Sequence, residues 1–258
     1  MQTQSLAGNP YGKPFEFEGS REHGILMIHG FTATPGTLYP MGKALNEQTG
    51  LFIKGILLPG HGTTAEDMAS TRWHDWLRAA ENAYDEMKST CRTVSVVGLS
   101  MGGTLTLLLA ERRSLRSAAA IAPALSVYNR KSWLAGLFWP FVRYTEETEY
   151  VPKKDFLNDY NISYRKTPVR CAADLNRLMR TAYRNLSKIH CPLLIAKAGR
   201  DETVRPEKID RIPGKAGGPV KMLTLPQSPH VCTLGPEREM LFRETAEFFQ
   251  TVPEGASI

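Results

Sequence analysis

The chain has 258 residues, of which 42% are hydrophobic and 22% are charged, and its formal net charge is +6. This length suits one large domain with a full core, and the composition excludes disordered, collagen-like and fibrous proteins. The basic residues are mostly dispersed, so the net charge favours a soluble basic protein over one that binds nucleic acid. The first 13 residues lack a signal-peptide core, no apolar run reaches the length of a membrane span, and the four cysteines lie far apart, as reduced thiols would. We therefore expect a cytoplasmic protein without stable membrane insertion.

Short apolar runs alternate with helical patterns along the chain. The runs predict buried strands at residues 24–28, 52–58, 93–97, 117–121, 193–198 and 220–225. They are continuously apolar, which is typical of parallel strands covered on both faces. Helical patterns separate them at residues 38–49, 72–90, 104–113 and 236–250. This alternation predicts an α/β fold with a mostly parallel, doubly wound sheet.

The stretch between Pro123 and His190 breaks this rhythm. It contains no clear strand, is rich in aromatic residues such as Trp133, and becomes helical toward its end. There, one face of the helix is apolar and the other carries most of the basic residues between 177 and 188. This basic face either steers an anionic ligand or is simply solvated, and solvation is the simpler account. We expect a single domain over residues 1–258 with a helical insertion at approximately 124–190.

The most informative motif is Gly98-Leu99-Ser100-Met101-Gly102. It follows a β-branched run and precedes a helical one, which predicts a strand, a sharp turn with Ser100 at its apex, and a helix. A serine in such a turn has a positive φ and brings its neighbours close to the backbone, so only glycine fits at 98 and 102. Chance alone produces the pattern in about one of ten chains of this length. The interpretation therefore depends on the other groups that a serine nucleophile needs.

Such a serine needs a base and an acid that orients the base. Among the histidines, only His190 and His230 follow Ser100. His190 precedes a predicted strand, at the wrong end of a parallel sheet, whereas His230 lies in a loop just after the last predicted strand. Asp201 lies in the turn that follows the strand at 193–198, with Glu202 beside it as the alternative. We predict a catalytic triad of Ser100, Asp201 and His230.

Attack on a carbonyl also needs two N–H donors for the oxyanion. One is expected from Met101, the residue after the serine, and the other from the loop that follows the strand at 24–28. We predict that the backbone N–H groups of Phe31 and Met101 form this oxyanion hole. No metal or cofactor is expected, because His61 and His74 lack a cluster of further ligands and the cysteines form no CxxC pair.

Four motifs in order resemble those of the α/β-hydrolase superfamily. They are His-Gly-Phe-Thr at 29–32, Leu-Pro-Gly-His-Gly at 58–62, Gly-Leu-Ser-Met-Gly-Gly at 98–103 and Ser-Pro-His at 228–230. From about residue 20 to residue 250 the chain is most similar to small bacterial carboxylesterases and monoacylglycerol lipases. The resemblance implies the α/β-hydrolase fold with a small helical cap over the sheet and no cofactor. It also implies roles for five residues: Ser100 as nucleophile, Asp201 as acid, His230 as base, and Phe31 and Met101 as oxyanion donors.

These features lead to the hypothesis of a serine carboxylesterase that acts on short- to medium-chain esters through an acyl-enzyme on Ser100. A monoacylglycerol lipase is the alternative within the class. That alternative depends on whether the aromatic insertion lines a pocket for a long acyl chain or only packs on the sheet. A slow-turnover binding or sensing protein and carbon–carbon bond hydrolysis are rivals on the same fold. The predicted partner is a small-molecule ester.

Overall fold

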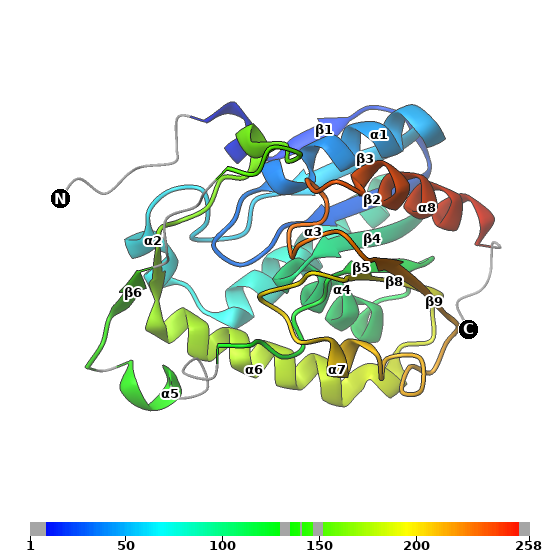
Figure 1. The fold of residues 1–258 in the computed structure, drawn as a ribbon. Coiled ribbons are helices and arrows are strands. Elements are labelled where there is room, and N and C mark those ends of the chain that lie inside the picture. The colour runs from blue at the N-terminus through cyan, green and yellow to red at the C-terminus, as the bar shows by residue number, and fades with distance from the viewer. Residues whose placement is uncertain (1–8, 130–134, 140, 147–151, 253–258) are drawn as a thin grey trace.

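The computed structural model describes residues 9–129, 135–139, 141–146 and 152–252. Within them a seven-stranded sheet has the order β1-β3-β2-β4-β5-β8-β9 (Figure 1). The strands are Phe15–Phe17 (β1), Ser20–Ile28 (β2), Leu51–Ile56 (β3), Thr93–Leu99 (β4), Ala118–Ile121 (β5), Leu193–Ala198 (β8) and Val220–Leu225 (β9). β1 pairs antiparallel with β3, and the other neighbours are parallel. The predicted mostly parallel sheet is confirmed.

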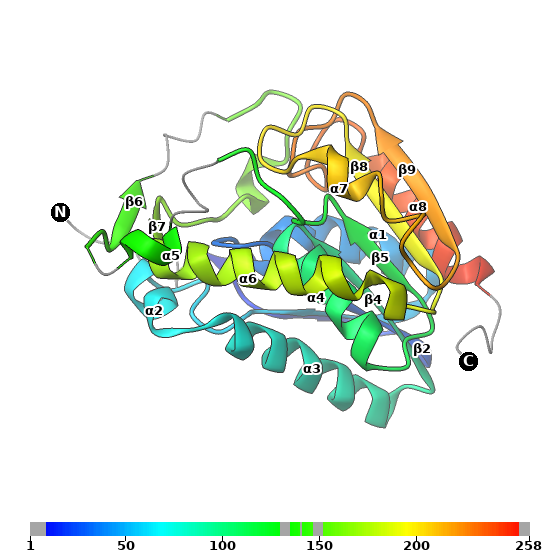
Figure 2. The same cartoon turned by 90° about the horizontal axis from the view of Figure 1, so that it is seen from below.

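Helices cover both faces of this sheet. The α-helices of the described residues are Tyr39–Thr49 (α1), Ala65–Ser70 (α2), Trp73–Thr90 (α3), Met101–Arg112 (α4), Ala135–Phe138 (α5), Val169–Asn185 (α6), Pro206–Ile209 (α7) and Arg238–Thr251 (α8). Figures 1 and 2 show α1 and α8 together on one face of the sheet, with α3, α4 and α6 on the other. This is the doubly wound arrangement that alternating strands and helices predict.

The core consists of two apolar layers, one on each face of the sheet. Strand β2 contributes to both, because successive side chains of a strand point to opposite faces. Leu26 and Ile28 pack in the layer under α3, α4 and α6, whereas Ile25 and Met27 pack in the layer under α1 and α8. All four side chains are fully buried. This double burial explains why the strand is continuously apolar in the sequence.

The segment between β5 and β8 differs from the prediction. It contains a small antiparallel pair, β6 (Tyr144–Glu146) with β7 (Lys166–Pro168), in addition to α5 and α6. The expectation of no strand in this insertion is therefore wrong, since strands of three residues are too short to leave a periodic pattern. The edge strand β1 escaped the prediction for the same reason. Trp133 and part of the predicted insertion lie outside the described residues.

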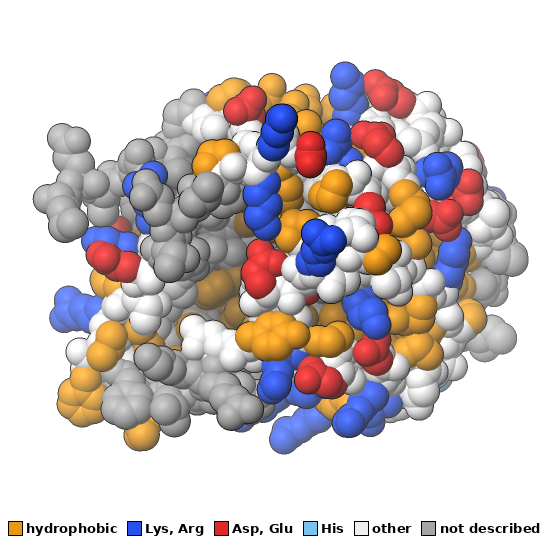
Figure 3. All heavy atoms as spheres, viewed as in Figure 1, with side chains coloured by type: hydrophobic (Ala, Val, Ile, Leu, Met, Phe, Trp, Pro, Cys, Tyr) orange, Lys and Arg blue, Asp and Glu red, His pale blue; other side chains and the backbone are white. Residues whose placement is uncertain are grey.

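Charged side chains are dispersed over the molecule. Figure 3 shows lysine and arginine interspersed with aspartate and glutamate on the face viewed. On α6, Arg177 pairs with Asp174 at 3.1 Å, and just beyond the helix Lys188 pairs with Glu111 at 3.4 Å. These ion pairs neutralise two of the basic residues between 177 and 188, which leaves less positive charge to attract an anionic ligand. No helix in the described ranges combines the length and apolarity needed to cross a bilayer.

Candidate active site

Ser100 occupies a strained turn between β4 and α4. Its backbone has φ 56° and ψ −115°, a conformation that residues with a side chain rarely adopt. A Cβ added at Gly98 would lie 2.2 Å from the Gly102 carbonyl oxygen, and one at Gly102 would lie 1.9 Å from the Ile28 oxygen. Glycine is thus required at both positions, as predicted from the motif. The turn presents the serine hydroxyl at the carboxyl edge of the sheet.

The three residues of the predicted triad form one hydrogen-bonded chain. The Ser100 Oγ lies 2.8 Å from Nε2 of His230, and Nδ1 of His230 lies 2.8 Å from Oδ2 of Asp201. The ionised carboxylate can only accept, so Nδ1 carries the proton and Nε2 accepts from the serine hydroxyl. The side chains of His230 and Asp201 are 12% and 7% exposed, which shields these bonds from water. The arrangement can move a proton from the serine to the histidine.

The turn after β8 selects Asp201 in preference to its neighbour. The Asp201 Oδ1 accepts the backbone N–H groups of Thr203 and Val204 at 2.8 and 2.7 Å, which leaves Oδ2 for the histidine. Glu202 instead forms an ion pair with Lys153 at 3.7 Å. In the structure Asp201, and not Glu202, therefore contacts His230, and two backbone N–H groups orient its carboxylate.

The loop that carries His230 is held by a residue that the sequence did not point to. Glu237, at the start of α8, accepts the Ser228 hydroxyl at 2.8 Å and the Gln227 N–H at 2.9 Å through one carboxylate oxygen. Ser228 is fully buried, so this bond is protected from solvent. The sequence does not mark Glu237 for this role, because only the fold brings the His230 loop and the start of α8 together.

Two backbone N–H groups lie beside the serine. Met101 is the first residue of α4, where the N–H groups of the first turn have no partner within the helix. Phe31 follows Gly30, whose Cα packs so closely on the serine that an added Cβ would lie 3.4 Å from the Ser100 Cβ. In the described part of the chain, neither the Phe31 nor the Met101 N–H donates to another protein group. Both N–H groups thus lack a protein acceptor among the described residues.

A cavity of about 400 Å³ opens at Ser100. Its apolar wall includes Phe31, Val127 and Leu175, and its polar lining includes Asn161 and Ser163. A ligand with an apolar part and a polar end would match this lining.

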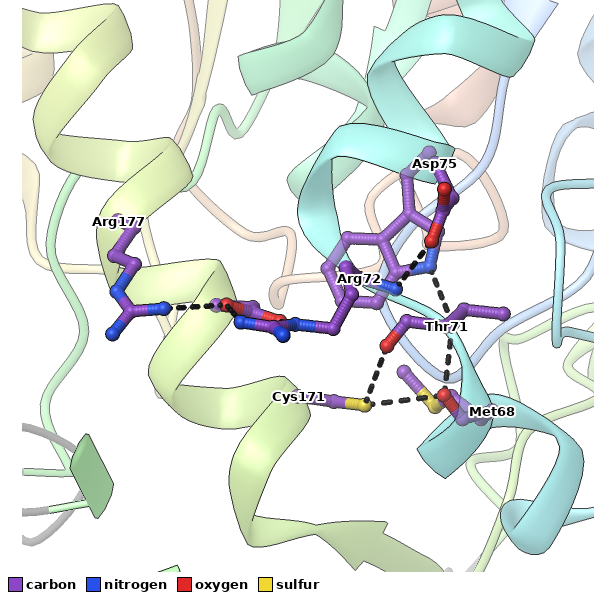
Figure 4. A network of polar contacts seen from close by, with 8 residues as sticks. Met68, Thr71, Arg72, Asp75, Cys171 and Arg177 are labelled. Carbon is purple, nitrogen blue, oxygen red and sulfur yellow. Dashed lines mark hydrogen bonds and ion pairs between the residues drawn. The ribbon is translucent and has the colours of Figure 1, made fainter. Parts of the chain in front are cut away.

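The wall that the insertion contributes is attached to the core by a buried carboxylate (Figure 4). Asp174 of α6, 1% exposed, accepts from Arg72 Nε at 2.7 Å and from Arg177 Nη1 at 3.1 Å. The thiol of Cys171 also donates to a backbone carbonyl of α2 at 3.2 Å. These contacts tie α6, which carries the cavity-lining Leu175, to α2 and to the start of α3.

A second serine–histidine pair lies elsewhere in the sheet. The His23 Nε2 is 2.8 Å from the Ser95 Oγ, which is itself 2.8 Å from the Ser117 Oγ. These residues lie toward the amino ends of their strands, away from Ser100, and the His23 ring packs against Phe249 in the core. Burial lowers the pKa of His23 to about 4. The pair thus satisfies buried polar groups, and neither side chain lines the cavity at Ser100.

A serine that can pass its proton to a histidine, beside two unpaired N–H groups, is equipped to attack a carbonyl carbon. On a sheet of this topology, the arrangement defines a serine hydrolase with the α/β-hydrolase fold. Comparison with known families agrees. The model of the family described as serine aminopeptidase, S33, matches residues 19–230, and the chain belongs to this family.

Named relatives show which kind of serine hydrolase this chain resembles. A thermostable monoacylglycerol lipase of Bacillus sp. (strain H-257) is 34% identical over 229 residues, 88% of this chain and 90% of the relative. A carboxylesterase of Bacillus subtilis (strain 168) is 24% identical and covers 92% of this chain and 96% of its own length. A solved structure of the metagenome-derived lipolytic enzymes LipS and LipT superposes with a TM-score of 0.86 at 26% identity, over 93% of this chain and 98% of that one. The chain is a serine hydrolase of the esterase and lipase kind.

Proposed function

We propose that this enzyme hydrolyses short- to medium-chain carboxylic esters through an acyl-enzyme on Ser100. The observation that carries the proposal is the size of the cavity at the serine. Ligand pockets span about 300 to 1,000 Å³, and a cavity of about 400 Å³ lies near the lower end of that range. It must hold both the acyl group and the alcohol of the ester, which favours a small substrate.

The geometry supports a two-step reaction. As the Ser100 oxygen attacks the ester carbonyl, His230 takes its proton at Nε2, and Asp201 stabilises the imidazolium through Nδ1. The oxygen of the tetrahedral intermediate accepts the N–H groups of Phe31 and Met101. His230 then gives the proton to the departing alcohol, which leaves an acyl-enzyme. A water molecule, deprotonated by the same histidine, releases the acid and restores the serine.

Monoacylglycerol hydrolysis is the second candidate. It is favoured by the 34% identical relative, which is a monoacylglycerol lipase, and by polar groups in the cavity lining. Asn161 and Ser163 could hydrogen-bond the free hydroxyls of a glycerol leaving group. This candidate needs room for a longer acyl chain along the apolar wall.

One substrate series separates the candidates. We expect the highest kcat/KM on p-nitrophenyl acetate or butyrate, a steep fall toward palmitate, and no turnover by Ser100→Ala. A maximum on long-chain monoacylglycerols would support the lipase instead. Wild-type turnover no faster than that of Ser100→Ala would refute the esterase mechanism and favour a binding protein.

A further inference from the structure

A buried histidine outside the triad bridges two backbone groups next to the oxyanion site. His29 is the residue directly after β2, and its side chain is fully buried. Its Nε2 lies 3.0 Å from the backbone N of Leu58, and its Nδ1 lies 2.8 Å from the carbonyl oxygen of Gly30. The mechanism described above makes no use of this side chain.

The two contacts fix which ring nitrogen carries the proton. A backbone N–H can only donate, so Nε2 of His29 must accept from Leu58. The neutral ring then carries its proton on Nδ1 and donates it to the Gly30 carbonyl. Burial, and to a lesser extent the neighbouring His61, lower the pKa of His29 to about 3, so the ring stays neutral near pH 7. The hydrogen bond to Gly30 is therefore a lasting feature of the folded enzyme.

The Gly30 carbonyl and the Phe31 N–H belong to the same peptide unit. In a planar trans peptide these two groups point in opposite directions, so fixing one fixes the other. The Gly30 carbonyl bonds the His29 ring, which is fully buried and does not line the cavity at Ser100, so the Phe31 N–H points away from this ring. Donation to a peptide carbonyl also polarises that peptide and strengthens its N–H as a donor.

We propose that His29 is a positioning residue for ester hydrolysis, which holds the peptide between Gly30 and Phe31 so that its N–H meets the developing oxyanion. The inference rests on the proposed function, because an oxyanion forms here only if Ser100 attacks a carbonyl. A second bond shares the task, since the Ala33 N–H also donates to the Gly30 carbonyl, at 3.3 Å. Loss of the histidine bond therefore loosens the oxyanion donor without removing it.

Two substitutions of similar size separate positioning from packing. In His29→Asn the amide nitrogen takes the place of Nδ1 and can still donate to Gly30. In His29→Gln the amide reaches the place of Nε2, where it can accept from Leu58 but cannot hold Gly30. Both variants lose the ring and its packing. His61→Gln is the matched control, because this ring is also buried and meets the His29 ring edge to face, with centroids 5.1 Å apart, but bonds the Pro59 carbonyl instead.

The readouts are kcat and KM for p-nitrophenyl butyrate and the Ki of a trifluoromethyl ketone, whose adduct carries an oxyanion. Removal of a whole oxyanion donor costs about 10²–10³ in kcat. For a loosened donor we expect His29→Gln to lose roughly 10- to 100-fold in kcat, with little change in KM and an equal rise in Ki. We expect His29→Asn and His61→Gln to keep kcat within about fivefold of wild type, on the same scale. Thermal unfolding of each variant shows that it is folded.

Equal losses in His29→Asn and His29→Gln, or a loss confined to KM, would overturn the proposal while leaving the esterase function intact. Failure of the esterase function would show separately, as wild-type turnover no faster than that of Ser100→Ala. If a variant does not fold, nitrogen-15 NMR of the wild-type enzyme provides the test. The expected spectrum has the His29 proton on Nδ1, and its resonance shifts when the ketone adduct forms. A proton on Nε2 would refute the inference.

Discussion

Asp201→Asn replaces one carboxylate oxygen by an amide nitrogen of the same size. The Thr203 and Val204 N–H groups both donate to Oδ1, so the amide oxygen of the variant must remain on that side. The NH₂ group must then face His230 and donate to its Nδ1. That contact moves the imidazole proton to Nε2, and a protonated Nε2 cannot accept the proton of Ser100. The variant is expected to keep its fold, but His230 can no longer act as the base for Ser100.

The expected loss is large. The same tautomer change in a serine protease triad lowers kcat about 10⁴-fold, which corresponds to about 5.4 kcal/mol at 1.36 kcal/mol per factor of ten. Because the bonds from Thr203 and Val204 persist, we expect the free energy of unfolding to stay within about 1 kcal/mol of wild type. A large kinetic effect with a small effect on stability separates the catalytic contribution of Asp201 from a structural one.

The assay is kcat for p-nitrophenyl butyrate at neutral pH, combined with urea unfolding. Glu202→Gln is the matched control, since it neutralises the adjacent carboxylate, whose partner is Lys153 and not the histidine. We expect this control to keep at least about half of the wild-type kcat, as a surface ion pair of this kind contributes little. Retention of activity within tenfold in Asp201→Asn, or an equal loss in Glu202→Gln, would refute the reasoning.

Three further predictions concern stability. Gly102→Ala forces a Cβ against the backbone at the end of β2 and should lower the free energy of unfolding in urea by about 3 kcal/mol or more. In the control Gly214→Ala the Cβ would meet nothing closer than 4.0 Å, so its stability should be nearly that of wild type. Equal losses of stability in the two variants would contradict this prediction. Burial lowers the pKa of His23 from 6.5 to about 4, so the unfolded chain binds more protons between these values. Stability should therefore fall from pH 7 to pH 5 by about 2 kcal/mol for this group, and His23→Gln should show a correspondingly smaller fall. Asp174→Ala removes the acceptor of Arg72, whose side chain is 39% exposed and can be hydrated instead, and should cost about 1.5 kcal/mol. A loss below about 0.5 kcal/mol would show that this ion pair does not stabilise α6.

The positions of Ser100, Asp201 and His230 were predictable because each lies in a turn or loop after the carboxyl end of a parallel strand. Ser100 follows β4, Asp201 follows β8 and His230 follows β9, and the carboxyl ends of parallel strands meet at one edge. The strands themselves were predictable because burial on both faces leaves a continuous apolar run. β8 and β9 have the predicted bounds.

The features that the sequence did not predict depend on contacts between segments that are distant in sequence. The His29 bridge requires the backbone of Leu58, 29 residues away, and the support of the His230 loop requires Glu237. The choice between Asp201 and Glu202 depended on where two backbone N–H groups point after the turn. None of these contacts leaves a periodic or compositional trace, and the short strands of the insertion leave none either.

The contact between Gly102 and Ile28 has a consequence for how this enzyme can be changed. It packs the serine turn against the end of the strand that leads to Phe31 through backbone atoms, so the spacing of these two segments depends on glycine at position 102. The cavity wall, by contrast, consists of side chains such as Val127 and Leu175. Substrate range can therefore be redesigned at these wall positions while the chemistry at Ser100 remains intact.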